Sequence, residues 1–72
     1  RMFESLMLGL RMTRGIDLRA FEDRHGQSFE SVYGEAAKQS LQKGRVQYTE
    51  DGFFRLTREG MDLMNAVLLD FM

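Results

Sequence analysis

The stretch LMLGLRMTRGID, from Leu6 to Asp17, passes from an apolar helical pattern through a turn to a new helix start. Gly15 suits the left-handed position that follows a helix C-terminus. Asp17 is a good N-cap, because its carboxylate can accept hydrogen bonds from the unpaired amides of a first helical turn. Gly9 costs about 1 kcal/mol of helix propensity relative to alanine, so it predicts the close approach of another backbone. The stretch therefore predicts two helices joined by a tight turn.

Helical spacing continues on both sides of this stretch. The first helix is expected to begin near Met2, and its predicted buried stripe is Met2, Phe3, Leu6, Met7 and Leu10. The second helix is expected over Leu18–His25 and is closed by Gly26. A third helix is expected from the Ser28 cap to Lys43, with a stripe formed by Phe29, Val32, Tyr33, Ala36, Ala37 and Leu41. Gly34, in the middle of the third helix, again predicts close packing rather than a break.

The stretch RVQYTEDGFFRLT, residues 45–57, predicts a β-hairpin. A two-residue turn would split the apolar side chains between the two faces of the hairpin. A three-residue loop, EDG at residues 50–52, places its glycine in the left-handed bulge position. The register that follows pairs Tyr48 with Phe54 and Val46 with Leu56, so that all four share one face. We therefore predict the three-residue loop.

The chain closes with a helix that Thr57 is expected to cap, running from Arg58 onward. One side of it is formed by Met61, Met64, Leu68 and Phe71, and is widened by Leu63, Val67 and Leu69. Such surplus apolar surface at both ends of a small domain indicates docking against partner structure. The predicted order is helix, helix, helix, strand, strand, helix. The fold class is therefore mainly α with a small β-hairpin, and winged-helix-like.

Composition excludes several classes of site. The chain has no cysteine, which rules out disulfides, thiolate metal sites and iron–sulfur ligation within it. Ten basic and eleven acidic residues nearly cancel, which argues against a nucleic-acid binder. No apolar run has the length of a membrane span, and no signal peptide is visible. A cytoplasmic location is the default expectation.

The residues leave three kinds of function open. A winged helix can read DNA, but the outward face of the third helix has no arginine, and Glu50 and Asp51 at the tip of the hairpin would repel phosphate. His25, the single histidine, most simply complements a helix dipole; as an axial haem ligand it would make the chain a haem-contacting module. The six methionines are expected mainly in the core. No constellation looks catalytic, which leaves a protein-interaction domain as the third possibility.

The segments ESLMLGLRMTRGIDLRAFEDRHG, residues 4–26, and FRLTREGMDLMNAVLLDF, residues 54–71, resemble one particular C-terminal domain. It is the domain that closes radical-SAM proteins of the oxygen-independent coproporphyrinogen III oxidase family. The most specific parts are MLGLR at residues 7–11, GID at residues 15–17, and Leu56-Thr57 with Gly60. The chain departs from the family pattern at Gly44-Arg45-Val46, where members usually have Gly-Leu-Leu or similar.

The resemblance implies that residues 1–72 are a single accessory domain, cut from a longer protein. The parent would carry an upstream radical-SAM barrel, with a C-x-x-x-C-x-x-C segment for a [4Fe–4S] cluster and S-adenosylmethionine. Its activity would be oxidative decarboxylation of coproporphyrinogen III, or haem binding and delivery in the chaperone-like branch, which the short MLGLRMTRGID form resembles more closely. The domain would pack on the barrel and help to cover its site. Glu4, Leu8 and Arg11, on the off-core face of the first helix, are the predicted docking residues.

Overall fold

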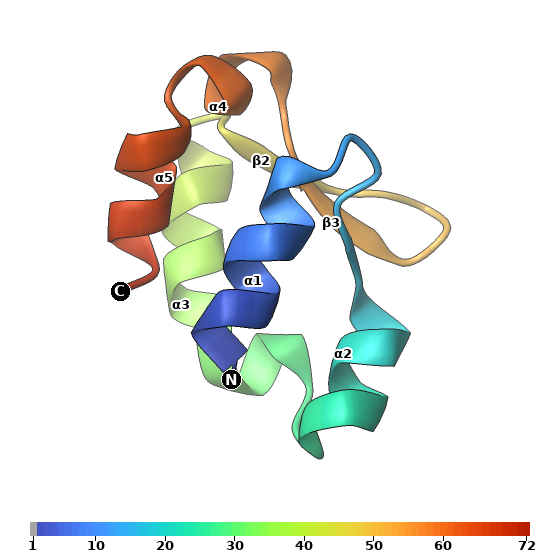
Figure 1. Cartoon of the computed structure of the whole chain (residues 1–72). Helices are drawn as coiled ribbons and strands as arrows, with labels where there is room; N and C mark the ends of the chain where they lie inside the picture. Colours follow the sequence, from blue (N-terminus) through green and yellow to red (C-terminus); the bar gives the residue numbers. More distant parts are fainter. Residues whose placement is uncertain (1) are drawn as a thin grey trace.

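Five helices and a small antiparallel sheet make up the computed structural model, which describes residues 2–72 (Figure 1). Arg1, the first residue of the predicted domain, lies outside the described residues. The helices are α1 (Met2–Arg11), α2 (Leu18–His25), α3 (Phe29–Gln42), α4 (Arg58–Asp62) and α5 (Met64–Asp70). The strands are β1 (Ile16–Asp17), β2 (Val46–Tyr48) and β3 (Phe53–Leu56), in the sheet order β1-β3-β2. The predicted fold class is confirmed.

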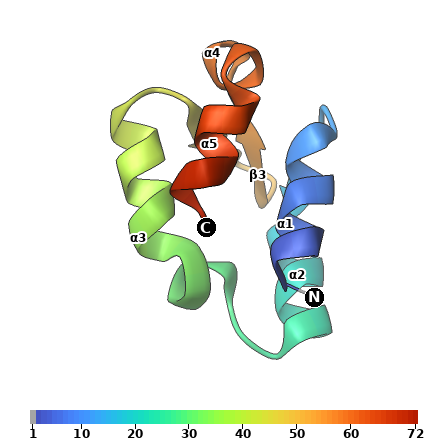
Figure 2. The ribbon, with the colours of Figure 1, turned by 60° about the vertical axis from the view of Figure 1, so that its left-hand side comes forward.

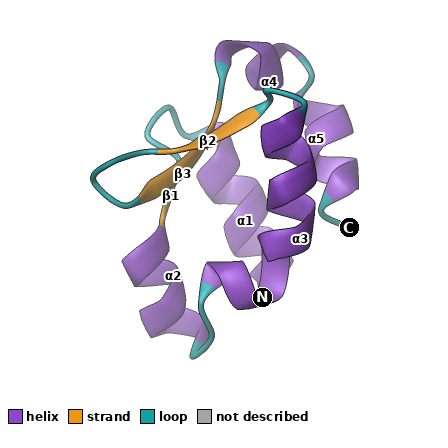
Figure 3. Ribbon diagram, turned by 180° about the vertical axis from the view of Figure 1, so that it is seen from behind, coloured by secondary structure: helices purple, strands orange, loops and turns teal. Residues whose placement is uncertain are grey.

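The helices lie around one end of the sheet, and the β2–β3 loop projects from it as a wing (Figure 1). Viewed after a 60° turn, α5 is seen between α3 and α1 (Figure 2). From behind, α3 and the sheet come to the front and α1 lies at the back (Figure 3). The two long faces of the domain, one formed by α1 with α2 and the other by α3 with β2, therefore point in different directions.

The predicted hairpin register is confirmed. Val46 pairs with Leu56 and Tyr48 pairs with Phe54. The backbone amide of Thr49 donates to the Phe53 carbonyl at 2.8 Å, which closes the three-residue loop. Gly52, the last loop residue, has a φ of 89°, as the left-handed bulge position requires.

The joint between the first two helices differs from the prediction of a direct helix–turn–helix connection. α1 ends at Arg11, and Ile16 and Asp17 form a third strand, β1, which pairs with Phe54 and Phe53 of β3. Gly15 has the expected positive φ, 92°, but it closes a turn in which its amide donates to the Met12 carbonyl at 3.1 Å. A Cβ at Gly15 would collide with the Phe54 carbonyl oxygen, so the close neighbour of this glycine is β3.

The predicted cap of the second helix is confirmed, and so are its boundaries. The Asp17 carboxylate accepts hydrogen bonds from the amides of Arg19 and Ala20, both at 3.1 Å. Asp17 is both the last residue of β1 and the N-cap of α2, so the strand passes into the helix without a loop.

Phe54 is at the centre of the core. It is fully buried, and its ring centroid lies 4.7 Å from that of Phe29, 4.9 Å from that of Tyr48 and 6.1 Å from that of Phe71. The other buried apolar residues are Leu6, Leu10, Ile16, Phe21, Ala37, Val46, Leu56 and Val67. Every helix except α4 contributes to this set, so the sheet and four helices share one core.

Two residues predicted on apolar faces are exposed. They are Leu41 on α3 and Tyr48 on β2, whereas Ser40, beside Leu41, is fully buried, as is the predicted Ala37. None of the six methionines is fully buried; Met2 and Met64 pack partly buried against the core. A helical period cannot decide which of two adjacent residues at the edge of a stripe is covered, because that depends on the element packed against it.

The predicted single C-terminal helix is divided in two. α4 ends at Asp62, and Leu63, with φ −116° and ψ 30°, leaves the helical conformation before α5 begins. The break turns Val67 fully into the core, although its spacing had placed it at the margin of the apolar side. Apolar periodicity runs across Leu63 without interruption, so it gave no sign of the break.

Contacts around Thr57 explain the Leu-Thr-x-x-Gly motif. As predicted, Thr57 caps α4, its Oγ1 accepting the Gly60 amide at 3.1 Å. The same hydroxyl donates to the Gly44 carbonyl at 2.7 Å, and the Thr57 amide donates to the Arg45 carbonyl at 2.9 Å. Gly60 is buried and packs so closely against the entry of β2 that a Cβ there would collide with the Arg45 carbonyl oxygen.

The two other helical glycines differ from each other. A Cβ at Gly9 would lie 2.5 Å from the Ile16 Cγ1, so Gly9 is packed closely, against a side chain rather than the expected backbone. The close packing predicted for Gly34 is wrong, because a Cβ there would meet only the Cγ of Glu30, at 3.3 Å.

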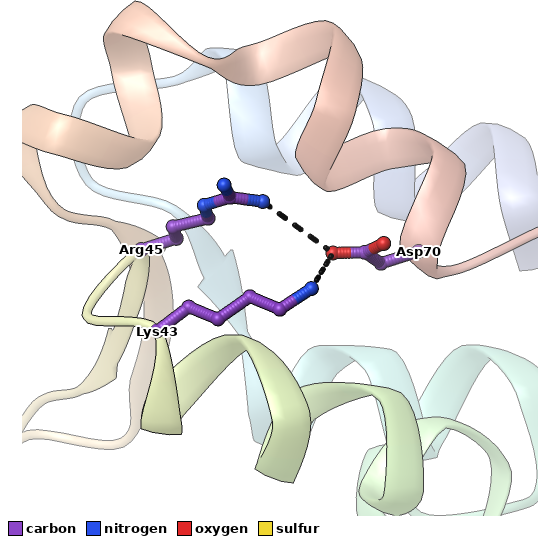
Figure 4. Close-up of polar contacts among 3 residues, drawn as sticks. All are labelled: Lys43, Arg45 and Asp70. Atoms are coloured by element: carbon purple, nitrogen blue, oxygen red, sulfur yellow. Dashed lines mark ion pairs between the residues drawn. The ribbon is translucent and has the colours of Figure 1, made fainter.

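Arg45, the charged residue at which the chain departs from the family pattern, is paired in the structure. Its Nη1 lies 3.8 Å from Asp70 Oδ2, and the Nζ of Lys43 lies 3.6 Å from the same oxygen (Figure 4). Both charged groups of the Arg45–Asp70 pair are largely buried. The pair connects the end of α5 to the entry of β2.

We expect Gly60→Ala to lower the free energy of unfolding by about 1–3 kcal/mol, because the methyl group has no room beside the Arg45 carbonyl. Gly34→Ala is the matched control: Glu30 is exposed and can move, so the helix propensity gained should raise stability by up to about 1 kcal/mol. Urea denaturation of both variants measures the two changes. Equal effects of the two substitutions would contradict this account of the motif.

Candidate functional site

An open groove of about 300 Å³ lies between α1 and α2. One wall is formed by Glu4, Ser5, Leu8 and Gly9 of α1, and the other by Ala20, Phe21, Arg24 and His25 of α2. Ile16 and Gly9 also line the groove, and they lie so close together that any side chain in place of Gly9 would displace Ile16. The groove therefore depends on the short connection between the two helices.

A hydrogen bond joins the two walls. His25 Nε2 lies 3.1 Å from Ser5 Oγ, and the His25 ring is tilted at 55° to the Phe21 ring with the centroids 4.6 Å apart. Phe21 is buried, whereas His25 is half-buried. As predicted, His25 lies in the last turn of α2, where a cation complements the helix dipole. Ligation of an iron atom through Nε2 would require the Ser5 contact to break.

The predicted docking residues lie on one exposed face of α1. Glu4 and Leu8 line the groove, and Leu8 is 63% exposed. Arg11 is exposed at the end of α1 but does not line the groove. Met12, in the turn directly after α1, is also exposed, at 62%. The face thus combines the exposed apolar side chain of Leu8 with charges of both signs, and a second exposed apolar side chain follows the end of the helix.

The three residues of the sequence LGL, at positions 8–10, have three different surroundings. Leu10 is fully buried in the core, Gly9 meets Ile16, and Leu8 points into solvent beside the groove. The motif that carries the family resemblance therefore builds both the joint to β1 and the exposed face.

Sequence reasoning missed the α2 wall. Ser5 and His25 are twenty residues apart, and no periodic pattern connects them. The exposure of Met12 was also missed, because it lies in the turn after α1, where helical spacing no longer applies.

The residues of the chain do not fit an iron–sulfur cluster. Such clusters are held by cysteine thiolates, and the chain has none. Residues 2–72 also contain no group of three histidine, aspartate or glutamate side chains arranged to hold a metal ion. In the same described part, no helix is long and apolar enough to cross a membrane.

Comparison with known proteins identifies the family. Residues 1–63 match the sequence profile described as HemN C-terminal domain. The chain belongs to the HemN C-terminal domain family. This confirms the resemblance seen in the motifs, and the match ends at Leu63, the residue at which the structure breaks between α4 and α5.

A curated relative matches nearly the whole chain. The chain is 30% identical to the heme chaperone HemW of Bacillus subtilis (strain 168) over 69 aligned residues. These aligned residues make up 96% of this chain. The chain spans 18% of the length of that relative. No solved structure gave a significant match.

We expect Ser5 and His25 to be coupled in a double-mutant cycle. Ser5→Ala and His25→Ala should together cost less than the sum of the single changes, with a coupling free energy of about 0.5–1.5 kcal/mol. A cycle of Ser5→Ala with Glu22→Ala, an exposed residue of the same helix, should be additive. Urea denaturation provides all the values, and additivity in the first cycle would contradict the bridge across the groove.

Proposed function

We propose that the chain is the C-terminal accessory domain of a longer radical-SAM protein of porphyrin or haem metabolism. Family membership supports this, together with a relative named a heme chaperone that is several times longer than the chain. Of the two branches, haem binding and delivery fits better than oxidation of coproporphyrinogen III, because the relative that covers nearly the whole chain is named a heme chaperone. A [4Fe–4S] cluster and S-adenosylmethionine would be bound by the rest of that protein.

The role of this domain in such a protein is to dock on the barrel and cover its site. The observation that carries this proposal is the exposed face of α1 with the turn that follows it, where Leu8 and Met12 leave most of their apolar surface in water. Burial of such surface is favourable by about 25 cal/mol per Å². Glu4 and Arg11 flank the apolar pair and would fix its orientation against groups of opposite charge.

Docking on a barrel would also exclude water from the covered site, a contribution that needs no catalytic residue in the domain itself. The groove walls are tied by the Ser5–His25 hydrogen bond, so the docking face is held in one shape before it meets its partner. A rigid face loses less conformational entropy on association than a flexible one.

Nucleic-acid binding has less support than docking. Glu30 and Glu35 lie on the exposed side of α3, where a DNA-reading winged helix would need cations. Arg14, near the wing, packs on the Phe53 ring with its Cζ 4.8 Å from the ring centroid. The tip of the wing carries exposed Glu50 and Asp51.

Leu8→Glu combined with Arg11→Glu should separate docking from folding. Both residues are exposed, so the variant chain should keep its melting temperature. In the full-length protein, the same changes should make the junction before this domain about tenfold more sensitive to limited proteolysis and should lower haem transfer or porphyrinogen oxidation in proportion.

The control for this experiment is Arg58→Glu with Glu22→Lys, which changes exposed charges outside the groove without altering an apolar residue. The control protein should behave as the wild type does. Unchanged proteolysis and activity in the Leu8→Glu, Arg11→Glu protein would show that the α1 face is not the docking surface.

A further inference from the structure

A second groove, of about 430 Å³, lies between α3 and β2, on the side of the domain that faces the viewer in Figure 3. It is lined by Glu30, Gly34, Glu35, Lys38 and Leu41 of α3, and by Tyr48 of β2. None of these residues lines the groove between α1 and α2. The two grooves are therefore separate surfaces.

Two of its residues occupy positions that the sequence pattern assigns to buried faces. Leu41 continues the apolar stripe of α3 and is 39% exposed. Tyr48 shares a strand face with the buried Val46 and is 42% exposed. If another molecule covered this groove, Leu41 and Tyr48 would both be buried, as the two sequence patterns predict.

Gly34 provides a second, independent observation. A glycine within a helix costs about 1 kcal/mol relative to alanine, and Gly9 and Gly60 offset this by close packing. A Cβ at Gly34 would meet only the flexible Glu30 side chain, at 3.3 Å. Nothing in the described chain therefore requires glycine at this position, which lines the groove. A glycine there does permit an external group to approach the helix backbone closely.

The charges of the groove select the chemistry of the partner. The groove lining contains two carboxylates, Glu30 and Glu35, and one ammonium group, Lys38, so negative charge is in excess. Burial, and secondarily the negative charge of Glu30, raise the pKa of the Tyr48 hydroxyl, which indicates that the Tyr48 side chain lies near Glu30. A guanidinium group can pair with carboxylates and stack on an aromatic ring at the same time, which an ammonium group does less well.

We infer that the groove between α3 and β2 binds a protein segment that presents an arginine beside a small apolar residue. The guanidinium group pairs with Glu30 and Glu35 and stacks on Tyr48. The apolar residue packs on Gly34 and Leu41. A nucleic acid does not fit, because the two carboxylates would repel its phosphates. This inference does not rest on the proposed docking of α1.

The geometry of the groove can be checked by titrating Tyr48. Glu30→Gln should lower the pKa of Tyr48 toward its ordinary value of about 10, whereas Glu35→Gln should leave it unchanged. Because burial raises the folded pKa, ionisation of Tyr48 costs the folded state more than the unfolded state, so stability falls as the pH rises from about 10 through the folded pKa. The ¹³C shift of the Tyr48 ring, followed against pH, measures the change, and identical titration curves for the two variants would contradict the assigned geometry.

The binding test uses two blocked dipeptides, acetyl-alanyl-argininamide and its neutral citrulline counterpart. Amide resonances of the ¹⁵N-labelled protein are followed during titration with each. The arginine probe should shift Gly34, Leu41 and Tyr48 saturably, and the citrulline probe should bind at least about fivefold more weakly. Glu30→Gln combined with Glu35→Gln should reduce binding of the arginine probe by a similar factor.

Gly34→Ala separates a binding role from a structural one. The variant should melt at or above the wild-type temperature and still bind the arginine probe at least about threefold more weakly. Leu8→Glu with Arg11→Glu should leave probe binding unchanged, so failure of the α1 docking proposal would be recognised separately. Equal binding of the two probes, wild-type affinity in Gly34→Ala, or larger shifts of these amides by a short DNA duplex would each overturn the inference.

Discussion

The pairing of Ile16 with Phe54 is the contact on which the rest of the structure depends. Phe54 is fully buried on the central strand, with Ile16 on one side and Tyr48 on the other. Gly15 makes the pairing possible, because a side chain there would strike the Phe54 carbonyl. Once Ile16 is placed, Gly9 of α1 must lie against it, and Asp17 must start α2. The position of both walls of the first groove follows from this one strand pair.

A winged-helix framework does not determine what the domain binds. On the α1 side, the exposed Leu8 and Met12 favour burial against a large partner surface. On the α3 side, where other winged helices present cations, this chain presents Glu30 and Glu35 around Tyr48. Both surfaces are therefore better matched to protein than to phosphate. In the proposed parent protein, the domain would act through contact and coverage, while the chemistry belongs to groups that it cannot ligate itself.

Local patterns predicted much of the fold. The hairpin register followed from four alternating apolar residues and one glycine, and the caps at Asp17, Ser28 and Thr57 lie where predicted. β1 was missed because two residues show no periodicity and its partner is distant in sequence. The break at Leu63 was missed because the apolar spacing continues across it.

The candidate site was predicted less completely than the fold. The exposure of Glu4, Leu8 and Arg11 could be predicted from helical spacing, because each lies off a single buried stripe. The opposing wall at His25 could not, since it depends on how α2 leaves the sheet. Peptide mapping of the native polypeptide on the N-terminal side of Arg1 tests the central claim most directly. The account predicts a continuous longer chain with a C-x-x-x-C-x-x-C segment, whereas a native protein of 8.4 kDa without cysteine would contradict it.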